Sequence, residues 1–191
     1  MKVLLIIPAY NEQENIQRVV ETVKAYADSK SDYTLEYIVI NDGSTDNTEG
    51  ICREHNIRTI HLIQNLGIGG AVQTGYKFAK IKGYDIAVQF DGDGQHDIQC
   101  LDALIDPVIK GICDFSIGSR FIENKSEFRS TAMRRFGIRF LSGIIRLMTG
   151  TKVTDPTSGF RAANKKAIAF LSNNYPVDYP EPESIVELSK H

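Results

Sequence analysis

The chain has 191 residues, of which 42% are hydrophobic and 24% are charged, and it contains 15 glycines and 6 prolines. These fractions are typical of one soluble globular domain, and they exclude disordered, collagen-like and low-complexity proteins. The 22 Lys and Arg nearly balance the 24 Asp and Glu, for a formal net charge of −2. No global charge therefore draws the chain to nucleic acid, and we expect no nucleic-acid partner.

Short runs rich in valine and isoleucine alternate with helical patterns along the first two-thirds of the chain. The expected strands cover 3–7, 35–40, 59–63, 86–90 and 115–118. The expected helices between them cover 14–27, 46–55, 71–81 and 101–110. This alternation predicts an α/β fold with a mostly parallel central sheet and helices on both faces, because strands buried on both sides read as nearly continuous apolar runs.

Beyond residue 118 the pattern changes to a long loop over 120–133 and then an amphipathic helix over 134–148. One face of this helix carries Arg135, Arg139, Ser142 and Arg146, and the other carries Phe136, Phe140, Ile144 and Leu147. Residues 120–146 hold seven basic side chains against two acidic ones, a net charge of +5 that leaves −7 for the rest. The pattern favours contact of 120–148 with an anionic acceptor or membrane surface, although a solvated helix face is the alternative.

The ends of the chain and its cysteines bear on its location. Cys52, Cys100 and Cys113 have neither a disulfide nor a zinc-site spacing, so we expect reduced thiols. No signal peptide and no apolar run of membrane-spanning length is present, which predicts a cytoplasmic protein, with the cytoplasmic face of a membrane as one option. A further helical pattern begins at residue 184 and is cut off at 191. We therefore expect the natural protein to continue.

Polar clusters follow three of the expected strands. In an open α/β sheet the carboxyl ends of parallel strands meet at one rim, where ligands bind. Each cluster alone could be ordinary turn chemistry, but three together predict a nucleotide site. The clusters are Pro8-Ala9-Tyr10-Asn11-Glu12, Asn41-Asp42-Gly43-Ser44 and Asp91-Gly92-Asp93.

The acidic pair Asp91 and Asp93 predicts a site for a hard divalent cation, Mg²⁺ or Mn²⁺, with Gln95 adding an amide oxygen. An EF-hand is excluded, because His96 stands where that loop needs glycine and Asp102 stands where it needs glutamate. His96 has no second histidine or cysteine at metal spacing, so we expect it to lie outside the metal's ligands.

Two further motifs leave alternatives open. The run Gly67-Ile68-Gly69-Gly70 lacks the third glycine of a dinucleotide fingerprint, since Val72 occupies that place, and it predicts instead a tight turn and helix start that brings Gly70 near phosphate. The segment from Asp155 to Arg161 is either a surface turn or a loop that supplies these two side chains to an anionic substrate.

Five motifs in one order resemble glycosyltransferase family two, in its dolichyl- or polyprenyl-phosphate sugar synthase branch, over residues 2 to about 165. They are Pro8-Ala9-Tyr10-Asn11-Glu12, Asn41-Asp42-Gly43-Ser44-Thr45-Asp46, Asp91-Gly92-Asp93-Gly94-Gln95-His96, Gly118-Ser119-Arg120 and Asp155-Pro156-Thr157-Ser158-Gly159-Phe160-Arg161. The resemblance implies a GT-A fold and an inverting transfer from a UDP- or GDP-linked sugar. Asn41 departs from the pattern, because many relatives have an acid there.

The resemblance also implies roles for individual residues. Pro8, Tyr10, Glu12 and Asp42 would hold the base and ribose. Asp91, Asp93 and Gln95 would hold the metal against the diphosphate. The candidate catalytic residues are Asp91, Asp93, Asp155 and Arg120. Residues 1–119 would form the nucleotide-sugar and metal-binding half of one catalytic domain, and 120–191 its acceptor side.

The acceptor determines whether a general base is needed. A polyprenyl or dolichyl phosphate is already anionic, which agrees with the absence of an obvious Ser-His-Asp or Cys-His set. A saccharide hydroxyl would require a base, and Asp178, Glu181 or Glu183 could serve. An alternative of another class is a non-catalytic module that only binds a nucleotide sugar.

Overall fold

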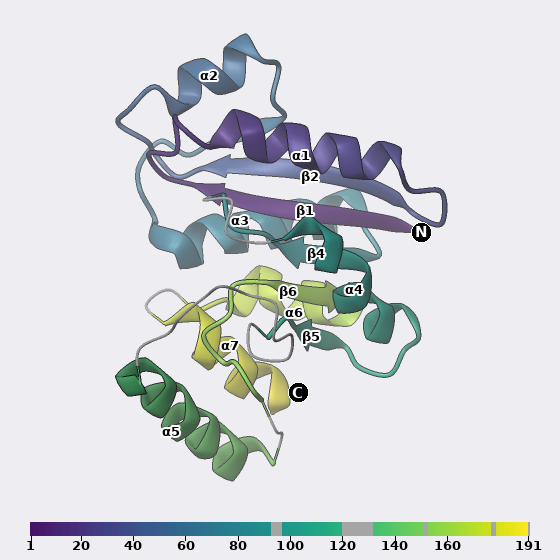
Figure 1. Ribbon diagram of the computed structural model, residues 1–191, viewed down its shortest axis with the longest axis vertical. Coiled ribbons are helices and arrows are strands. Elements are labelled where there is room, and N and C mark those ends of the chain that lie inside the picture. Colours follow the sequence, from purple (N-terminus) through teal and green to yellow (C-terminus); the bar gives the residue numbers. More distant parts are fainter. Residues whose placement is uncertain (93–96, 120–131, 151–152, 177–178, 191) are drawn as a thin grey trace.

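The computed structural model describes residues 1–92, 97–119, 132–150, 153–176 and 179–190, and these form a six-stranded sheet with helices on both sides (Figure 1). The strand order is β3-β2-β1-β4-β6-β5, and all strands run parallel except β6, which is antiparallel to both neighbours. The strands are β1 Lys2–Ala9, β2 Thr34–Asn41, β3 Thr59–His61, β4 Ile86–Gln89, β5 Phe115–Ile117 and β6 Arg161–Asn164.

Helices cover the two faces of the sheet with separate hydrophobic cores. Alternate residues of β1 point to opposite faces, so that Val3, Leu5 and Ile7 pack on the side of α1 and α4, and Leu4 and Ile6 pack on the side of α3 and α6. A short 3₁₀ turn, Ile98–Cys100, precedes α4. The helices are α1 Ile16–Asp28, α2 Thr48–Glu54, α3 Gly67–Lys82, α4 Leu101–Ile109, α5 Ala132–Thr149, α6 Lys165–Asn174 and α7 Pro180–Ser189.

The amphipathic pattern explains how the first helix docks on the sheet. The apolar side chains of α1 at the i, i+3, i+4 and i+7 positions all point into the core. Burying one such aliphatic side chain contributes about 1.5–3 kcal/mol, so this stripe, more than helix propensity, holds α1 on the sheet. The buried residues of the stripe are Ile16, Val19, Val20 and Val23.

The predicted α/β class is confirmed, and each of the five expected strands lies where the apolar runs indicated. Two elements of the second half were not predicted, β6 and α6. The strand β6 reads Arg-Ala-Ala-Asn, which has no β-branched residue, and it inserts between β4 and β5. Its burial therefore comes from its neighbours in the sheet and leaves no pattern in its own residues.

The helices α5 and α7 lie beyond the β5 edge, at the opposite end of the molecule from α2 (Figure 1). The helix α7 begins at Pro180 instead of residue 184, with proline in the first turn, where its missing N–H is not needed. The structure describes all three cysteines and places none of them in a disulfide, as expected. In the ranges that the structure describes, no helix combines the length and the hydropathy needed to cross a bilayer.

Candidate functional site

A cavity of about 390 Å³ opens at the carboxyl ends of β1, β2 and β4, and we call it the rim cavity. It lies where the order of the strands reverses on either side of β1, the place at which open α/β sheets bind ligands. Five of the predicted site residues meet there. Its lining consists of Pro8, Ala9, Tyr10, Glu12, Asp42, Asn65, Gly67, Ile68, Ala71, Asp91 and Gly92.

Proline at position 8 is compatible with a central strand because of where β4 ends. The pairing of β1 with β4 stops at Ile6, which faces Gln89. Successive residues of a strand direct their backbone hydrogen-bonding groups to opposite sides. The Ile6 carbonyl accepts from Phe90 on the β4 side and the Ala9 carbonyl accepts from Asp42 on the β2 side, so the Pro8 nitrogen faces the β4 side, beyond the last β1–β4 pair. The absent N–H therefore breaks no ladder bond.

The polar loops after β1 and β2 bind each other, which explains much of their sequence. Asn11 has a left-handed backbone (φ 57°), and its side-chain oxygen accepts a 2.9 Å hydrogen bond from the Thr45 N–H. The Asn11 N–H donates to the Ser44 hydroxyl at 3.0 Å, and the Glu12 N–H donates to the Thr48 hydroxyl at 2.9 Å. These contacts hold Tyr10 and Glu12 at the mouth of the rim cavity.

Asp42 connects β2 to the start of α3. Its side chain is only 3% exposed, and its Oδ1 accepts a 2.7 Å hydrogen bond from the Leu66 N–H directly before that helix. The adjacent Gly43 has φ +65°, and a Cβ there would lie 2.7 Å from the Asn65 nitrogen, so this close approach requires glycine. Asp42 is thus a fixed carboxylate in the wall of the cavity.

The glycine run forms the first turn of α3, as predicted, but Gly67 lines the rim cavity and Gly70 is not in its lining. A Cβ at Gly70 would meet the Leu66 side chain at 2.5 Å, so the packing of that turn accounts for this glycine. Gly67, Ile68 and Ala71 are the α3 residues that face the cavity, and helical spacing from Gly67 could have indicated the last of them.

Asn41, where the sequence departs from the family pattern, is buried and makes specific contacts. Its side-chain nitrogen lies 3.0 Å from Nδ1 of His61, and its oxygen accepts a 3.2 Å hydrogen bond from the Ser44 N–H. The amide thus joins the ends of β2 and β3 and supports the Asp42–Ser44 turn. His61, for which the sequence indicated no partner, is the residue it contacts.

Asp91 follows β4 and faces the rim cavity, and two observations describe how its carboxylate is held. The Nε2 of Gln89 donates to Oδ1 of Asp91 over 3.5 Å, and Gln89 Oε1 accepts a 2.9 Å bond from the Tyr175 hydroxyl. Gly159 lies directly against the carboxylate, since a Cβ there would come within 2.5 Å of Oδ2. A hard carboxylate oxygen held at the cavity fits a divalent cation.

Part of the predicted machinery lies outside the described residues: Asp93, Gln95 and Arg120. His96, which we expect outside the metal's ligands, lies outside them too. The predicted base candidate Asp178 lies outside them as well. Within the described ranges, no three histidine, cysteine, aspartate or glutamate side chains gather closely enough to hold a metal. Asp91 is therefore the member of the predicted metal set that the structure describes.

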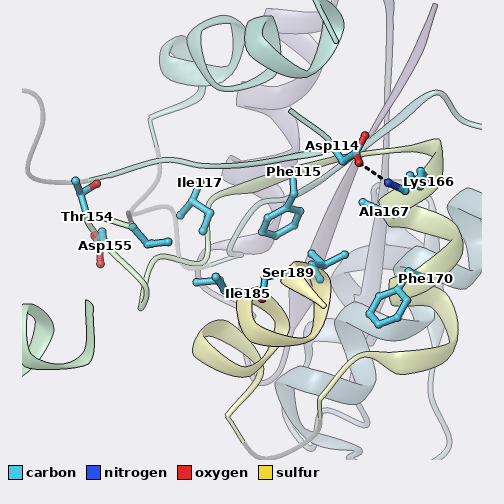
Figure 2. Close-up of a pocket in the computed structure, with 12 residues that line it drawn as sticks. Asp114, Phe115, Ile117, Thr154, Asp155, Lys166, Ala167, Phe170, Ile185 and Ser189 are labelled. Carbon is cyan, nitrogen blue, oxygen red and sulfur yellow. Dashed lines mark hydrogen bonds and ion pairs between the residues drawn. The ribbon is translucent and has the colours of Figure 1, made fainter. Parts of the chain in front are cut away.

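Asp155 and Arg161 are not surface residues. Asp155 is buried, and its Oδ1 accepts a 3.0 Å hydrogen bond from the Thr157 hydroxyl. It does not line the rim cavity but a second cavity of about 350 Å³, the edge cavity, which lies between β5, α6 and α7 (Figure 2). Apolar side chains such as Phe115, Phe170 and Ile185 line the edge cavity, and the Asp114–Lys166 ion pair (2.9 Å) lies at its other end.

The sequence suggested that Arg161 lies in a surface turn or contacts an anionic substrate, and both interpretations were wrong. Its side chain is 0% exposed, and it donates four hydrogen bonds to protein atoms: the carbonyls of Pro156, Ser158 and Glu181 and the hydroxyl of Ser184. It can therefore neither lie in a surface turn nor reach an anionic substrate. The sequence could not reveal this, because the partners in α7 lie twenty residues and more along the chain.

The described part of the apolar face of α5 points outward, and the side chain of Phe136 lies outside the described residues. Ile145 is buried, but the side chains at the i, i+4, i+7 and i+8 positions along the opposite face are exposed. Monomeric proteins seldom leave such a row of large apolar side chains in water. The exposed residues are Phe140 (64%), Ile144 (39%), Leu147 (89%) and Met148 (63%).

Two of the acids proposed as a base for a hydroxyl acceptor, Glu181 and Glu183, lie in the first turn of α7. Glu183 is exposed, and Glu181 is half-buried with its backbone carbonyl bonded to Arg161. Neither lines the rim cavity or the edge cavity.

Comparison with known proteins identifies the family. The model of "Glycosyl transferase family 2" matches residues 4–171. The UDP-N-acetylglucosamine–dolichyl-phosphate N-acetylglucosaminyltransferase of Methanococcus voltae is 37% identical over 188 residues, covering 89% of this chain and 72% of that protein. The polyprenol monophosphomannose synthase of Mycolicibacterium smegmatis is 29% identical, covering 87% and 63% of the two chains.

A solved structure shares the fold. The glucosyl-3-phosphoglycerate synthase of Mycobacterium tuberculosis, crystallised with Mn²⁺ and UDP-glucose, superposes with a TM-score of 0.64 at 22% identity, covering 87% of this chain and 57% of that one. The chain thus spans little more than half the length of that structure. At this identity the likeness is one of fold, and it confirms the GT-A architecture.

Proposed function

The chain belongs to glycosyl transferase family 2, and we propose that it is the catalytic part of an inverting enzyme that transfers a sugar from a UDP-linked donor to a polyprenyl or dolichyl phosphate. The observation that carries the proposal is the meeting of Pro8, Tyr10, Asp42 and Asp91 in one cavity at the switch point of the sheet. The substrate classes are supported by the name of the Methanococcus voltae relative.

The nucleoside is assigned to the part of the rim cavity between β1 and β2. Asp42 is fixed there by its bond from Leu66, and a buried carboxylate accepts N–H donors of a pyrimidine base without needing to reorganise. Tyr10 is about half exposed at the mouth and offers an aromatic face to the base. The backbone N–H of Glu12 is bonded to the Thr48 hydroxyl, and the Glu12 carboxylate would accept hydrogen bonds from the ribose hydroxyls.

Asp91 is assigned to the diphosphate side. A divalent cation bound there would supply Lewis-acid stabilisation of the leaving diphosphate. We assign its ligation to Asp91 together with Asp93 and Gln95, and propose Mg²⁺ or Mn²⁺ as the ion. The pair Gln89 and Gly159 keeps the Asp91 carboxylate facing the cavity, one by a hydrogen bond and the other by leaving room for it.

The acceptor phosphate requires cations and no strong base. As the acceptor oxygen bonds to the anomeric carbon, the bond from that carbon to the diphosphate breaks and the nucleoside diphosphate leaves with the electron pair. A phosphate monoester is mostly dianionic at pH 7, so no proton has to be removed. We propose that Arg120 and the basic residues of 120–146 attract this anion, and that Asp155 lies on the acceptor side of the site.

We further propose that α5 places the enzyme on an anionic membrane surface. Its exposed apolar row would enter the interface, and the +5 charge of 120–146 complements anionic headgroups. This arrangement would deliver a lipid-linked phosphate to the rim cavity from the membrane side.

Isothermal titration with UDP-sugars and GDP-sugars, each with and without Mn²⁺, tests the donor assignment. We expect UDP-sugar binding that strengthens with Mn²⁺, followed by transfer to a polyprenyl phosphate with inversion at the anomeric carbon. Metal-independent binding would contradict the mechanism and favour a binding module. Transfer to a saccharide but not to the lipid phosphate would favour the hydroxyl acceptor, and a stronger response to GDP-sugars would replace the UDP assignment.

A further inference from the structure

A buried polar layer lies directly beneath the candidate site, on the side of the sheet that α3 and α6 cover. It contains Gln89 of β4, Arg161 of β6, and Tyr175 at the end of α6. Gln89 and Arg161 are direct register partners across β4 and β6. All three side chains are buried, although the core on this face of the sheet is formed mainly by apolar side chains.

Arg161 holds together two segments that are far apart in the sequence. Its Nε donates to the Ser158 carbonyl at 2.6 Å and its Nη2 to the Pro156 carbonyl at 2.9 Å, which fixes the loop over 155–159. Its Nη1 donates to the Glu181 carbonyl and to the Ser184 hydroxyl, both at 2.7 Å, which fixes the first turn of α7. One guanidinium thus sets the position of the loop relative to the helix.

The loop that Arg161 fixes touches the site at its other end. Gly159 lies against the Asp91 carboxylate so closely that a Cβ would reach Oδ2 at 2.5 Å. Asp155 lies at the start of the same loop and faces the edge cavity. A small displacement of the loop would therefore move Asp155 and press on Asp91 together.

The four hydrogen bonds of the Arg161 guanidinium go to carbonyl and hydroxyl oxygens, while the carboxylates of Asp155 and Glu181 stabilise its charge electrostatically. Burying such a charge is costly for stability, because its lost hydration is only partly replaced. An aliphatic side chain would serve a purely structural core better. The planar fork of arginine, in contrast, can hold several carbonyl groups in one fixed geometry, which the ammonium of lysine cannot.

We propose that Arg161 is a positioning residue of the transferase, which fixes the loop over 155–159 so that Asp91 holds its place in the rim cavity and Asp155 its place in the edge cavity. This inference rests on the proposed function. It predicts that the side chain controls the rate of the transfer step without touching either substrate, and that α7 contributes to the site through Ser184.

The test compares Arg161→Lys and Ser184→Ala with the wild-type chain, with Leu171→Ala as a control that removes a buried side chain of α6 in the same core. At saturating Mn²⁺ and at a temperature where each protein is folded, we expect kcat of Arg161→Lys to fall roughly ten- to a hundredfold, because a small misplacement of reacting groups has effects of that size. The donor KM should change little. Ser184→Ala should show a smaller fall in the same direction, and Leu171→Ala should keep its kcat despite a lower Tm.

Hydrogen exchange of the unliganded proteins gives a second readout that needs no activity. In Arg161→Lys we expect the amides of 155–160 to exchange roughly tenfold faster, with β1 unchanged. Equal acceleration throughout the chain, or a kcat per folded molecule that matches Leu171→Ala, would overturn the proposal. If the wild-type protein transfers no sugar, the proposed function fails, while the exchange data still decide whether Arg161 fixes the loop.

Discussion

The hydroxyl of Tyr175 donates a 2.9 Å hydrogen bond to the side-chain oxygen of Gln89, and both groups are buried behind the candidate metal carboxylate. Burial raises the pKa of the Tyr175 phenol well above its ordinary value, so the hydroxyl keeps its proton and remains a donor. We expect Tyr175→Phe to lower the free energy of unfolding by about 1–3 kcal/mol, because the Gln89 oxygen is left buried without its donor. Urea denaturation measures this change. Tyr179→Phe removes a hydroxyl from a residue that is 70% exposed and should leave stability unchanged; equal effects of the two variants would show that burial of the pair is unimportant.

Gly159→Ala tests the contact between the loop and Asp91. The added methyl group would lie 2.5 Å from Oδ2 of Asp91, so either the carboxylate or the loop must move. We expect the affinity for Mn²⁺ in the presence of UDP to fall about ten- to a hundredfold, the usual range when a group that orients a metal ligand is changed. Calorimetry measures it. Gly143→Ala, in α5, adds a methyl group that meets no atom within 4 Å and should bind Mn²⁺ normally. Unchanged affinity in Gly159→Ala would place the metal away from Asp91.

Asp42→Asn tests the nucleoside assignment. The amide cannot accept hydrogen bonds as strongly as the buried carboxylate does, and it weakens the bond from the Leu66 N–H at the start of α3. We expect the dissociation constant for UDP to rise about tenfold, which corresponds to the loss of one charged hydrogen bond. Asp32→Asn removes the same charge from an exposed position and should bind UDP like the wild type. If the two variants bind UDP equally, Asp42 does not contact the base.

The ion pair between Glu36 and Arg58 should make the stability of the fold sensitive to acid. The Arg58 guanidinium, at 2.7 Å, lowers the pKa of the Glu36 carboxyl; burial opposes this shift, and the Tyr84 hydroxyl at 2.9 Å assists it. A carboxyl whose pKa is lower in the folded state stabilises the protein above its unfolded pKa, near 4.3. That stabilisation is lost as pH falls through the lower folded value. We expect Glu36→Gln to flatten the fall of Tm in this window, measured from pH 6 to about pH 3. The exposed Glu54→Gln should retain the wild-type slope; a slope unchanged in both variants would contradict the assignment.

The exposed row on α5 predicts binding to anionic vesicles. Replacing Leu147 and Met148 together by serine removes two large apolar side chains from the proposed interface, and we expect vesicle affinity to fall about tenfold or more. Sedimentation with vesicles containing phosphatidylglycerol measures it. The matched control replaces Ile63 and Ile81 together by serine, since this pair is at least as exposed as the α5 pair but lies on another part of the surface. Arg135→Glu with Arg139→Glu should weaken binding as well, and if that variant retains both vesicle binding and transfer to a lipid acceptor, the membrane role must be abandoned.

The amino-acid sequence by itself determined the first half of this protein. The strands β1 and β4 are short, almost wholly apolar runs and α1 carries an amphipathic stripe, so local periodicity was sufficient to place them. The rim cavity followed from the same pattern, because parallel strands necessarily bring their carboxyl ends, and with them Pro8, Asp42 and Asp91, to one edge. Asp93, Gln95 and Arg120 remain predictions from sequence.

Only the tertiary structure decided the second half. The short strand β6 carries no apolar pattern, yet it is buried because β4 and β5 enclose it. Arg161 then becomes an internal residue, since its hydrogen-bond partners come from a loop and from α7 and neither is visible in the local sequence.

The amphipathic pattern correctly predicted the helix α5, but it could not tell where the apolar face of this helix lies. Such a pattern does not distinguish a face that packs on a core from one that meets a membrane. The net charge of −2 is likewise a property of the whole chain, and it hides an uneven distribution of charged residues. Residues 120–146 are basic and the rest of the chain is acidic. Local periodicity reports the conformation of a segment, whereas its partners are set by contacts between residues distant in the chain.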